Sequence, residues 1–369
     1  MERMKRVMLV FGTRPEAIKM APVVKALEKR EGVEPIVVVT AQHREMLDQV
    51  LELFQIVPDH DLDLMRPRQT LEEMTARILN AMRRVLEKEQ PDLVLVHGDT
   101  TTTFAASLAA FYQQIPVGHV EAGLRTYQKY APFPEEMNRQ LTGVLADYHF
   151  APTDQAAENL RLENKQSPII VTGNTVIDAL KTTVSADYTH PVLKSLAASG
   201  RKLILLTVHR RENHLQLPQI FDAIERLADS HPDIEIIYPV HPNPVVLEAA
   251  EQLKNHPRIQ LIEPLDVFDF HNLAARATLI LTDSGGIQEE APSLGVPVLV
   301  LRETTERPEG VEAGTLKLVG TDPERIYTAG HQLLTDPIAY EAMAQAANPY
   351  GDGHAAERIV DAILSEVPV

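Results

Sequence analysis

The feature that most constrains the fold is the regular alternation of short apolar runs with longer amphipathic segments. The runs are rich in Val, Ile and Leu and have the usual length of buried strands. The segments between them carry apolar residues at helical spacing, such as Leu71, Met74, Ile78 and Met82. Strands that alternate with helices predict a parallel sheet wrapped by helices. The strands predicted first are 7 to 11, 35 to 40, 92 to 98, 115 to 121 and 168 to 174.

The same pattern restarts after a polar, less regular stretch near residues 182 to 201. A chain of 369 residues with 44% hydrophobic content exceeds the size of one core. We therefore predict an α/β protein with two Rossmann-like, doubly wound parallel-sheet domains and a cleft between them. The first is 1–175 together with a C-terminal helix at 354–369, and the second is 176–353. The second set of predicted strands is 202 to 209, 234 to 241, 259 to 264, 278 to 284 and 296 to 302.

Composition excludes several classes of function. The formal net charge is -17 and no dense Lys/Arg run occurs, so neither nucleic acid nor a membrane is an expected partner. The absence of cysteine excludes disulfides, thiolate metal sites and cysteine nucleophiles. The first apolar stretch is too short for a signal peptide, and no run approaches membrane-spanning length. A cytoplasmic protein is the expectation.

Glycines and ionisable residues follow the predicted strands. Ligands of doubly wound sheets bind outside the carboxyl ends of the strands, so these positions are candidate site residues. A purely structural protein would not usually end so many strands in ionisable groups. The positions are Gly12-Thr13-Arg14, Gln42-His43, His97-Gly98-Asp99, Glu121-Ala122-Gly123, Gly173-Asn174, His209-Arg210-Arg211, His241, Glu263 and Ser284-Gly285-Gly286.

The turn Ser284-Gly285-Gly286 opens a predicted helix, whose free N–H groups and dipole form an anion site. Taken alone, such a turn is as often a plain tight turn. The segment 351 to 356, "GDGHAA", fits a dinucleotide pattern but follows no strand, so no NAD and no other cofactor is predicted. No His pair has metal-binding spacing on a predicted helix, so no metal is predicted.

Nine collinear motifs resemble the non-hydrolysing, bacterial-type UDP-N-acetylglucosamine 2-epimerases. The resemblance implies an isomerase that interconverts UDP-GlcNAc and UDP-ManNAc, a two-domain fold like that of GT-B glycosyltransferases, and a homodimer. The motifs are "FGTRPEAIKMAP" (11 to 22), "VHGDTTT" (96 to 102), "HVEAGLRT" (119 to 126), "PFPEEMNRQL" (132 to 141), "GNTVIDAL" (173 to 180), "HRREN" (209 to 213), "LTDSGGIQEEAPSLGVPVLVLR" (281 to 302), "TERPEG" (305 to 310) and "NPYGDG" (348 to 353).

The implied reaction is an anti elimination of UDP across C1 and C2, which gives a 2-acetamidoglucal, followed by re-addition of UDP. It needs proton-transfer groups on both faces of C2 and a stabilised diphosphate. Crowded carboxylates are expected to raise one another's pKa values, which suits one as acid and another as base. Which carboxylate takes the C2 proton stays open. The resemblance implies these catalytic residues: Asp99, Glu121, Glu135 and His209.

The resemblance also implies a set of substrate contacts. The Ser284-Gly285-Gly286 turn would bind the pyrophosphate and Glu290 the ribose hydroxyls, which explains why an acidic residue follows an anion site. Arg14 and Lys19 would reach the diphosphate. The remaining implied contacts are Phe270 beside the uracil and Arg307 on the nucleotide.

Some bacterial members are activated by a second UDP-GlcNAc. Glu45 replaces a Gln at this site, and an added carboxylate there would weaken effector binding. The matched effector positions are Gln42, Arg68, Glu135, Arg210 and His241.

Three other functions are compatible with these sequence features: a hydrolysing 2-epimerase, a GT-B glycosyltransferase, and a non-catalytic nucleotide-sugar sensor.

Overall fold

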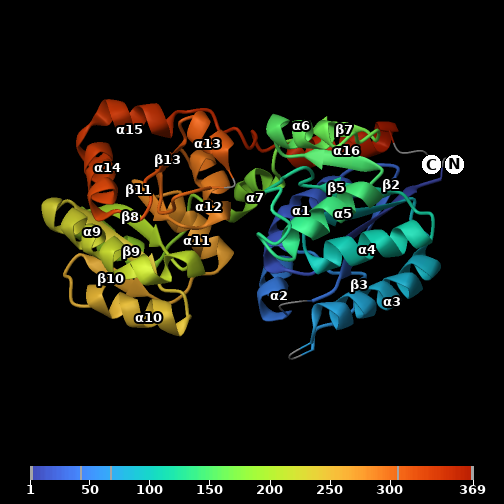
Figure 1. The fold of residues 1–369 in the computed structure, drawn as a ribbon, viewed down its shortest axis with the longest axis horizontal. Coiled ribbons are helices and arrows are strands. Elements are labelled where there is room, and N and C mark those ends of the chain that lie inside the picture. The colour runs from blue at the N-terminus through green and yellow to red at the C-terminus, as the bar shows by residue number, and fades with distance from the viewer. Residues whose placement is uncertain (1–2, 42–43, 67–68, 306, 367–369) are drawn as a thin grey trace. The chain divides into compact units, whose positions relative to one another are not determined.

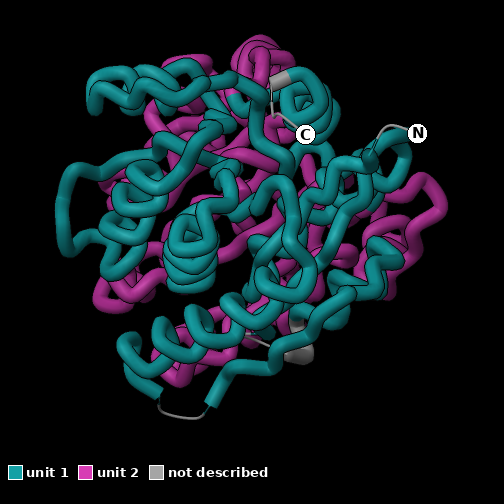
Figure 2. Tube along the Cα trace, turned by 90° about the vertical axis from the view of Figure 1, so that its right-hand side faces the viewer, with its two compact units in different colours: residues 1–182, 350–369 teal, residues 183–349 magenta. Residues whose placement is uncertain are grey.

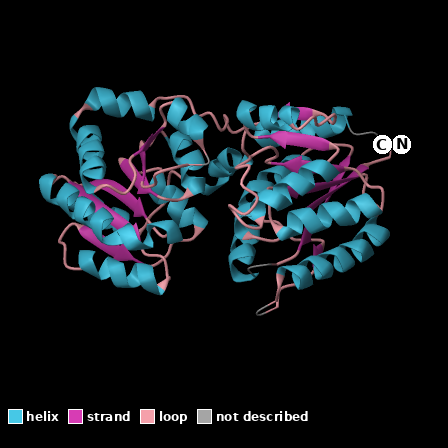
Figure 3. Cartoon of the chain, viewed as in Figure 1, coloured by secondary structure: helices cyan, strands magenta, loops and turns pink. Residues whose placement is uncertain are grey.

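The computed structural model describes residues 3–41, 44–66, 69–305 and 307–366. The chain divides into two compact units (Figure 2). Unit 1 comprises residues 1–182 and 350–369, and unit 2 comprises residues 183–349. The boundaries drawn from the sequence were 175/176 and 353/354. Each unit is a parallel sheet between helices (Figure 3), so the predicted α/β class with two Rossmann-like sheets is confirmed.

The sheet of unit 1 has seven strands in the order β3-β2-β1-β4-β5-β6-β7, and every neighbouring pair is parallel. The central strands are buried on both faces, which explains why they read as continuous apolar runs. The sequence pattern does not predict the two-residue edge strand. The strands are β1 Lys5–Phe11, β2 Val33–Val39, β3 His60–Asp61, β4 Leu93–His97, β5 Val117–Val120, β6 Tyr148–Ala151 and β7 Ile169–Val171.

The helices of unit 1 cover both faces of this sheet (Figure 1). Apolar residues of the third and fourth helices pack on one face of the central strands. The first helix packs against the last helix of the chain, so the C-terminal segment belongs to the N-terminal unit. The helices are α1 Arg14–Glu28, α2 Arg44–Leu53, α3 Leu71–Glu89, α4 Thr101–Tyr112, α5 Glu135–Leu145, α6 Asp154–Leu162, α7 Thr175–Thr183 and α16 Ala355–Glu366.

The sheet of unit 2 has six parallel strands in the order β10-β9-β8-β11-β12-β13. Its last edge strand is also absent from the sequence prediction, because a lysine interrupts the apolar run Leu316–Leu318. The strands are β8 Lys202–Thr207, β9 Ile234–Pro239, β10 Ile259–Ile262, β11 Leu279–Thr282, β12 Val298–Val300 and β13 Leu316–Leu318.

Two apolar clusters lie on the two faces of this second sheet. One cluster includes α9 and α14, and the other includes α8, α11 and α12. The helices are α8 Pro191–Ser199, α9 Leu217–Ser230, α10 Pro244–Ala250, α11 Val267–Ala274, α12 Gly285–Glu290, α13 Pro308–Glu312, α14 Pro323–Thr335 and α15 Pro337–Ala344, with 3-10 turns η1 Arg211–Gln216, η2 Glu251–Leu253 and η3 Ala291–Leu294.

Both sheets reverse their strand order beside their first strand. In unit 1 the reversal lies between β1 and β4, and in unit 2 between β8 and β11. Loops at the carboxyl ends of such strands form the usual ligand site of this architecture. The loops here carry Arg14 and Asp99 in unit 1, and His209 and Ser284 in unit 2.

Candidate active site

Glu121 is a largely buried acidic residue of unit 1 with an unusual backbone conformation. It follows β5 and is held at φ 61°, a left-handed conformation that is uncommon for a residue other than glycine. Its Oε2 accepts hydrogen bonds from the Lys19 ammonium and, at 3.0 Å, from Asn174 Nδ2. An unfavourable backbone conformation persists only where the surroundings impose it, and such residues cluster at functional sites.

Basic groups surround the carboxylate of Glu121. Burial opposes its ionisation, but the nearby basic groups, above all the charge of Lys19, outweigh burial and lower its pKa well below the ordinary value. The expectation that neighbouring carboxylates would raise this pKa is therefore wrong. The physical reason is that Lys19 extends from α1 to the end of β5 and supplies the nearest charge. The carboxylate of Glu121 is therefore ionised at neutral pH.

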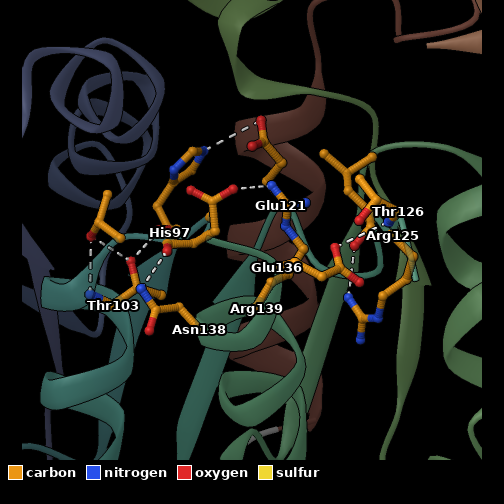
Figure 4. Close-up of polar contacts among 12 residues, drawn as sticks. His97, Thr103, Glu121, Arg125, Thr126, Glu136, Asn138 and Arg139 are labelled. Atoms are coloured by element: carbon orange, nitrogen blue, oxygen red, sulfur yellow. Dashed lines mark hydrogen bonds and ion pairs between the residues drawn. The ribbon is translucent and has the colours of Figure 1, made fainter. Parts of the chain in front are cut away.

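His97, the last residue of β4, is a second feature of this site (Figure 4). Its Nε2 lies 3.6 Å from Glu121 Oε2. The side chain is 4% exposed, and neither ring nitrogen has a hydrogen-bond partner in the described structure. Burial lowers the pKa of His97 to about 4, against the opposing charge of Glu121. The imidazole is therefore neutral at physiological pH.

His97 is one of three buried histidines on adjacent strands, together with His119 on β5 and His149 on β6. Burial lowers the pKa of His149 to about 4 and that of His119 well below its usual range. An unfolded chain binds protons at these histidines below about pH 6.5, while the folded chain does not. Each therefore costs about 1.4 kcal/mol of stability per pH unit as the pH falls from about 6 towards 4.

Replacement of His149 by leucine is expected to remove its share of this pH dependence. The difference in unfolding free energy between wild type and His149→Leu should shift in favour of the variant by about 1 to 2 kcal/mol between pH 7 and pH 5. Urea unfolding at several pH values measures it. The exposed His354, replaced in the same way, is the control. A pH-independent difference for His149→Leu would contradict the assignment of this histidine as neutral and buried.

Asp99 is the carboxylate of this site that follows β4. Its carboxylate accepts from Arg139 on α5, and its backbone carbonyl accepts from Asn138 Nδ2 at 3.0 Å. Arg139 thus pairs with Asp99 and also lowers the pKa of Glu121. Arg139 and Asn138 were not predicted as site residues, although they lie in the "PFPEEMNRQL" motif.

Glu135, the third predicted carboxylate, is half-buried at the first position of α5. Its neighbour Glu136 is fully buried and accepts the backbone N–H groups of Thr126 (3.0 Å) and Tyr127 (3.1 Å). Glu136 thus ties α5 to the loop that follows Glu121. The role of Glu135 as a catalytic residue stays a prediction.

Glu16 joins the loops that carry Arg14 and Asp99. Its carboxylate accepts the N–H groups of Gly12 (2.9 Å) and Thr13 (2.7 Å) and the hydroxyl of Thr100 (2.6 Å). Burial raises its pKa, although these hydrogen bonds oppose the rise. This contact links the ends of β1 and β4 at the switch point of the sheet.

Glu16→Ala is expected to lower both stability and turnover. The change leaves two backbone donors buried without a partner, at about 3 kcal/mol in total, and frees the loops beside Arg14 and Asp99. We expect turnover to fall about tenfold or more, since small displacements of positioned groups are costly. Chemical unfolding and kcat measure the two effects.

The matched control is Glu73→Ala, because Glu73 forms the same type of capping box with Thr70 at the start of α3 but is exposed. Its loss should cost about 1 kcal/mol and leave kcat unchanged. Equal effects of the two substitutions would show that Glu16 is only a helix cap.

In unit 2, the fully buried Asp283 organises the loop that starts at His209. Its carboxylate accepts the N–H groups of His209 (3.0 Å) and Arg210 (2.8 Å) and the side-chain amide of Asn213 (3.1 Å). His209 stacks on the ring of His241, with centroids 5.1 Å apart. Burial lowers the pKa of His209, against the charge of Asp283. Asp283 was not predicted, because its partners are remote in sequence.

The Ser284-Gly285-Gly286 turn follows Asp283 and begins α12. A Cβ at Gly285 would lie 2.7 Å from Arg307 Nη1, so a larger residue there would displace the guanidinium from its present position. Arg307 Nε donates to the buried Glu289 at 2.7 Å. Glu289 therefore orients the arginine rather than facing the anion site, which resolves the apparent conflict between the turn and its acidic neighbours.

Glu290 ends α12, and its Oε2 lies 3.2 Å from His271 Nε2. Phe270, the residue before His271, is half-buried and packs against the apolar cluster that includes α11. The candidate nucleotide contacts of unit 2 thus come from α11, α12, the turn before α12 and Arg307 before α13. Gln42 and Arg68 of the predicted effector site lie outside the described residues, as does the side chain of Glu45, while His241 is exposed.

Metal binding finds no support in the described part of the chain, which holds no group of three or more His, Asp or Glu side chains placed to bind a metal. No helix among the described residues is both long and apolar enough to span a bilayer.

Comparison with known proteins places the chain in a family. The family model described as UDP-N-acetylglucosamine 2-epimerase matches residues 25–364. The UDP-N-acetylglucosamine 2-epimerase of Bacillus subtilis (strain 168) is 62% identical over 362 residues, which are 97% of this chain and 95% of the relative.

Solved structures agree with this match. The UDP-GlcNAc 2-epimerase of Neisseria meningitidis, solved with bound UDP-GlcNAc, is 52% identical with a TM-score of 0.89, covering 98% of this chain and 100% of that one. The S. aureus protein MnaA, solved with UDP, is 58% identical with a TM-score of 0.88, covering 98% and 96%. A kitacinnamycin glycotransferase, at 15% identity and a TM-score of 0.67 over 99% and 100% of the two chains, shares the GT-B-like fold.

Proposed function

Because the chain belongs to the non-hydrolysing, bacterial UDP-N-acetylglucosamine 2-epimerase family, we propose that it interconverts UDP-GlcNAc and UDP-ManNAc by elimination and re-addition of UDP. One observation carries the proposal. Glu121 is an ionised carboxylate in a left-handed backbone conformation, held by Lys19 and Asn174 beside a neutral imidazole. An ionised carboxylate that is fixed in position can accept a proton from a bound substrate.

The chemistry at C2 explains why the reaction passes through an intermediate. The C2–H bond is not next to a carbonyl, so direct removal of its proton would give an unstabilised carbanion. In the proposed route a base takes the C2 proton while the C1–O bond to UDP breaks, which gives the 2-acetamidoglucal. UDP then re-adds at C1, and a proton reaches C2 from the opposite face. Each direction needs one acceptor and one donor.

We assign the acceptor role to Glu121 for one face, since its carboxylate is ionised. Asp99, through its contact with Arg139, and Glu135 are the proposed groups for the second face. His209 is the proposed donor to the departing diphosphate, and Arg14 and Lys19 are proposed to add positive charge there. The proposed nucleotide contacts are Ser284, Gly285, Gly286, Glu290, Arg307 and Phe270.

Product analysis tests the proposal. The purified protein, incubated with UDP-GlcNAc alone, should give UDP-ManNAc with no free sugar, as ion-exchange chromatography and mass spectrometry would show. Free ManNAc with an equal amount of UDP would instead assign the hydrolysing reaction. Binding without any product would favour a transferase that lacks its acceptor, or a sensor.

Two further features belong to the same proposal. We propose a homodimer and a second UDP-GlcNAc as activator, on the family resemblance. Activation should appear as sigmoidal dependence of rate on UDP-GlcNAc concentration, with Arg210 and His241 among the residues involved. A hyperbolic dependence of the rate on UDP-GlcNAc concentration over the whole range would contradict activation by a second UDP-GlcNAc.

A further inference from the structure

We propose that His271 is a positioning residue that sets the preference of this protein for ribonucleotides over 2′-deoxyribonucleotides, by fixing the orientation of Glu290. The inference rests on the proposed function, because it takes Glu290 as the partner of the ribose hydroxyls. It goes beyond that function by naming the residue that makes the contact selective.

The imidazole of His271 bridges two groups from distant segments. The residue lies on α11 and is 2% exposed. Its Nδ1 lies 2.7 Å from Thr183 Oγ1, and its Nε2 lies 3.2 Å from Glu290 Oε2. A carboxylate only accepts, so Nε2 must carry the hydrogen, and in a neutral ring Nδ1 then accepts from the Thr183 hydroxyl. The two contacts together select one tautomer and one ring orientation.

The threonine that orients the ring is itself fixed. Asn272, the residue after His271, donates through Nδ2 to the Thr183 carbonyl at 2.7 Å. Its Oδ1 accepts the N–H of Ser185 at 2.9 Å. Asn272 is fully buried, so water does not compete for these bonds. The hydrogen-bond chain from Thr183 through His271 to Glu290 is thus anchored at its far end.

The carboxylate at the near end lies beside the proposed nucleotide site. A Cβ at Gly286 would lie 3.3 Å from Glu290 Oε1, so this oxygen is next to the second glycine of the Ser284-Gly285-Gly286 turn. The Glu290 side chain is 16% exposed. One carboxylate oxygen is therefore held by His271 while the group lies against the turn.

A carboxylate held in one plane can accept from both hydroxyls of a ribose in a fixed geometry. Removal of the 2′-hydroxyl leaves an acceptor without a partner in a partly buried site, which weakens binding of the deoxynucleotide. A carboxylate that turns freely can instead find water and tolerates the loss. His271 therefore acts on selectivity more than on affinity.

The test is the ratio of dissociation constants for 2′-deoxy-UDP and UDP, measured by titration calorimetry. Wild type should prefer UDP by about tenfold or more. Two variants separate the contacts of the ring, because a glutamine nitrogen falls near the position of Nε2 and an asparagine amide near that of Nδ1. His271→Gln should keep most of the preference, and His271→Asn should reduce it to about twofold.

Glu290→Gln serves as the positive control and should also lower the ratio. Thr183→Val, close to isosteric, removes the hydroxyl that orients the ring and should give an intermediate ratio even if a His271 variant fails to fold. Equal weakening of both nucleotides by His271→Asn would reduce His271 to a structural residue and overturn the inference. A wild-type ratio near one would overturn it as well.

Failure of the proposed function has a different signature. A protein that prefers UDP through His271 but converts no UDP-GlcNAc retains the inference and loses the epimerase assignment. A protein that epimerises UDP-GlcNAc, but whose ratio of dissociation constants for 2′-deoxy-UDP and UDP does not depend on His271, retains the epimerase assignment and loses the inference.

Discussion

Glu121→Gln is expected to lower kcat for epimerisation by about a thousandfold, within the range of general acid–base contributions. A glutamine side chain cannot take the C2 proton. It also places an amide where Lys19 and Asn174 now donate to an oxygen. The affinity for UDP should change far less than kcat, because Ser284, Glu290 and Arg307, which make most of the proposed nucleotide contacts, lie in unit 2. NMR assays of UDP-ManNAc formation and UDP titrations measure the two effects.

Glu158→Gln is the control, because Glu158 is an exposed carboxylate on α6 of the same unit and pairs only with Arg161 among the contacts of the described structure. It should leave kcat unchanged. A Glu121→Gln protein with kcat within about fivefold of wild type would exclude Glu121 as the proton acceptor.

Asp283→Ala is expected to destabilise the protein by about 3 to 5 kcal/mol and to abolish turnover. The substitution leaves the N–H groups of His209 and Arg210 and the amide of Asn213 without their common acceptor in a buried site. The loop at His209 would lose its anchor, so the proposed donor to the leaving diphosphate would move. Urea unfolding followed by circular dichroism gives the stability change.

Asp283→Asn should be milder, at about 1 to 2 kcal/mol, because one amide oxygen can still accept from the loop. Asp322→Ala is the matched control in the same unit, since Asp322 accepts only the N–H of Arg325 as an exposed helix cap. It should cost about 1 kcal/mol without loss of activity. Equal costs in unfolding free energy for the two alanine variants would show that the three hydrogen bonds to Asp283 do not hold the loop at His209 in place.

The sequence could predict the strands and the loops that follow them, because period and apolar content determine which segments are buried in a parallel sheet. Glu121, Asp99, His209 and Ser284 all follow observed strands. The edge strands β3 and β13 and the internal strand β6 escaped prediction. The two residues of β3 leave no recognisable period, and polar residues interrupt the apolar runs of β6 and β13.

The partners of the candidate site residues could not be predicted. Lys19 meets Glu121 across 102 positions, and Asn213 meets Asp283 across 70. Such pairs depend on side-chain direction and on strand order, which local patterns do not encode. For the same reason the general expectation that crowded carboxylates raise one another's pKa values fails at Glu121: its neighbouring cations, Lys19 and Arg139, come from α1 and α5 rather than from its own segment.

Proton NMR of UDP-GlcNAc incubated with the protein in D2O tests the central claim most directly. Elimination and re-addition through an exchangeable acid predicts UDP-ManNAc with deuterium at C2, and no deuterium in either sugar when Glu121→Gln replaces wild type. UDP-ManNAc that retains the original hydrogen at C2 would contradict the account, because that hydrogen could not have passed to a side chain in exchange with solvent.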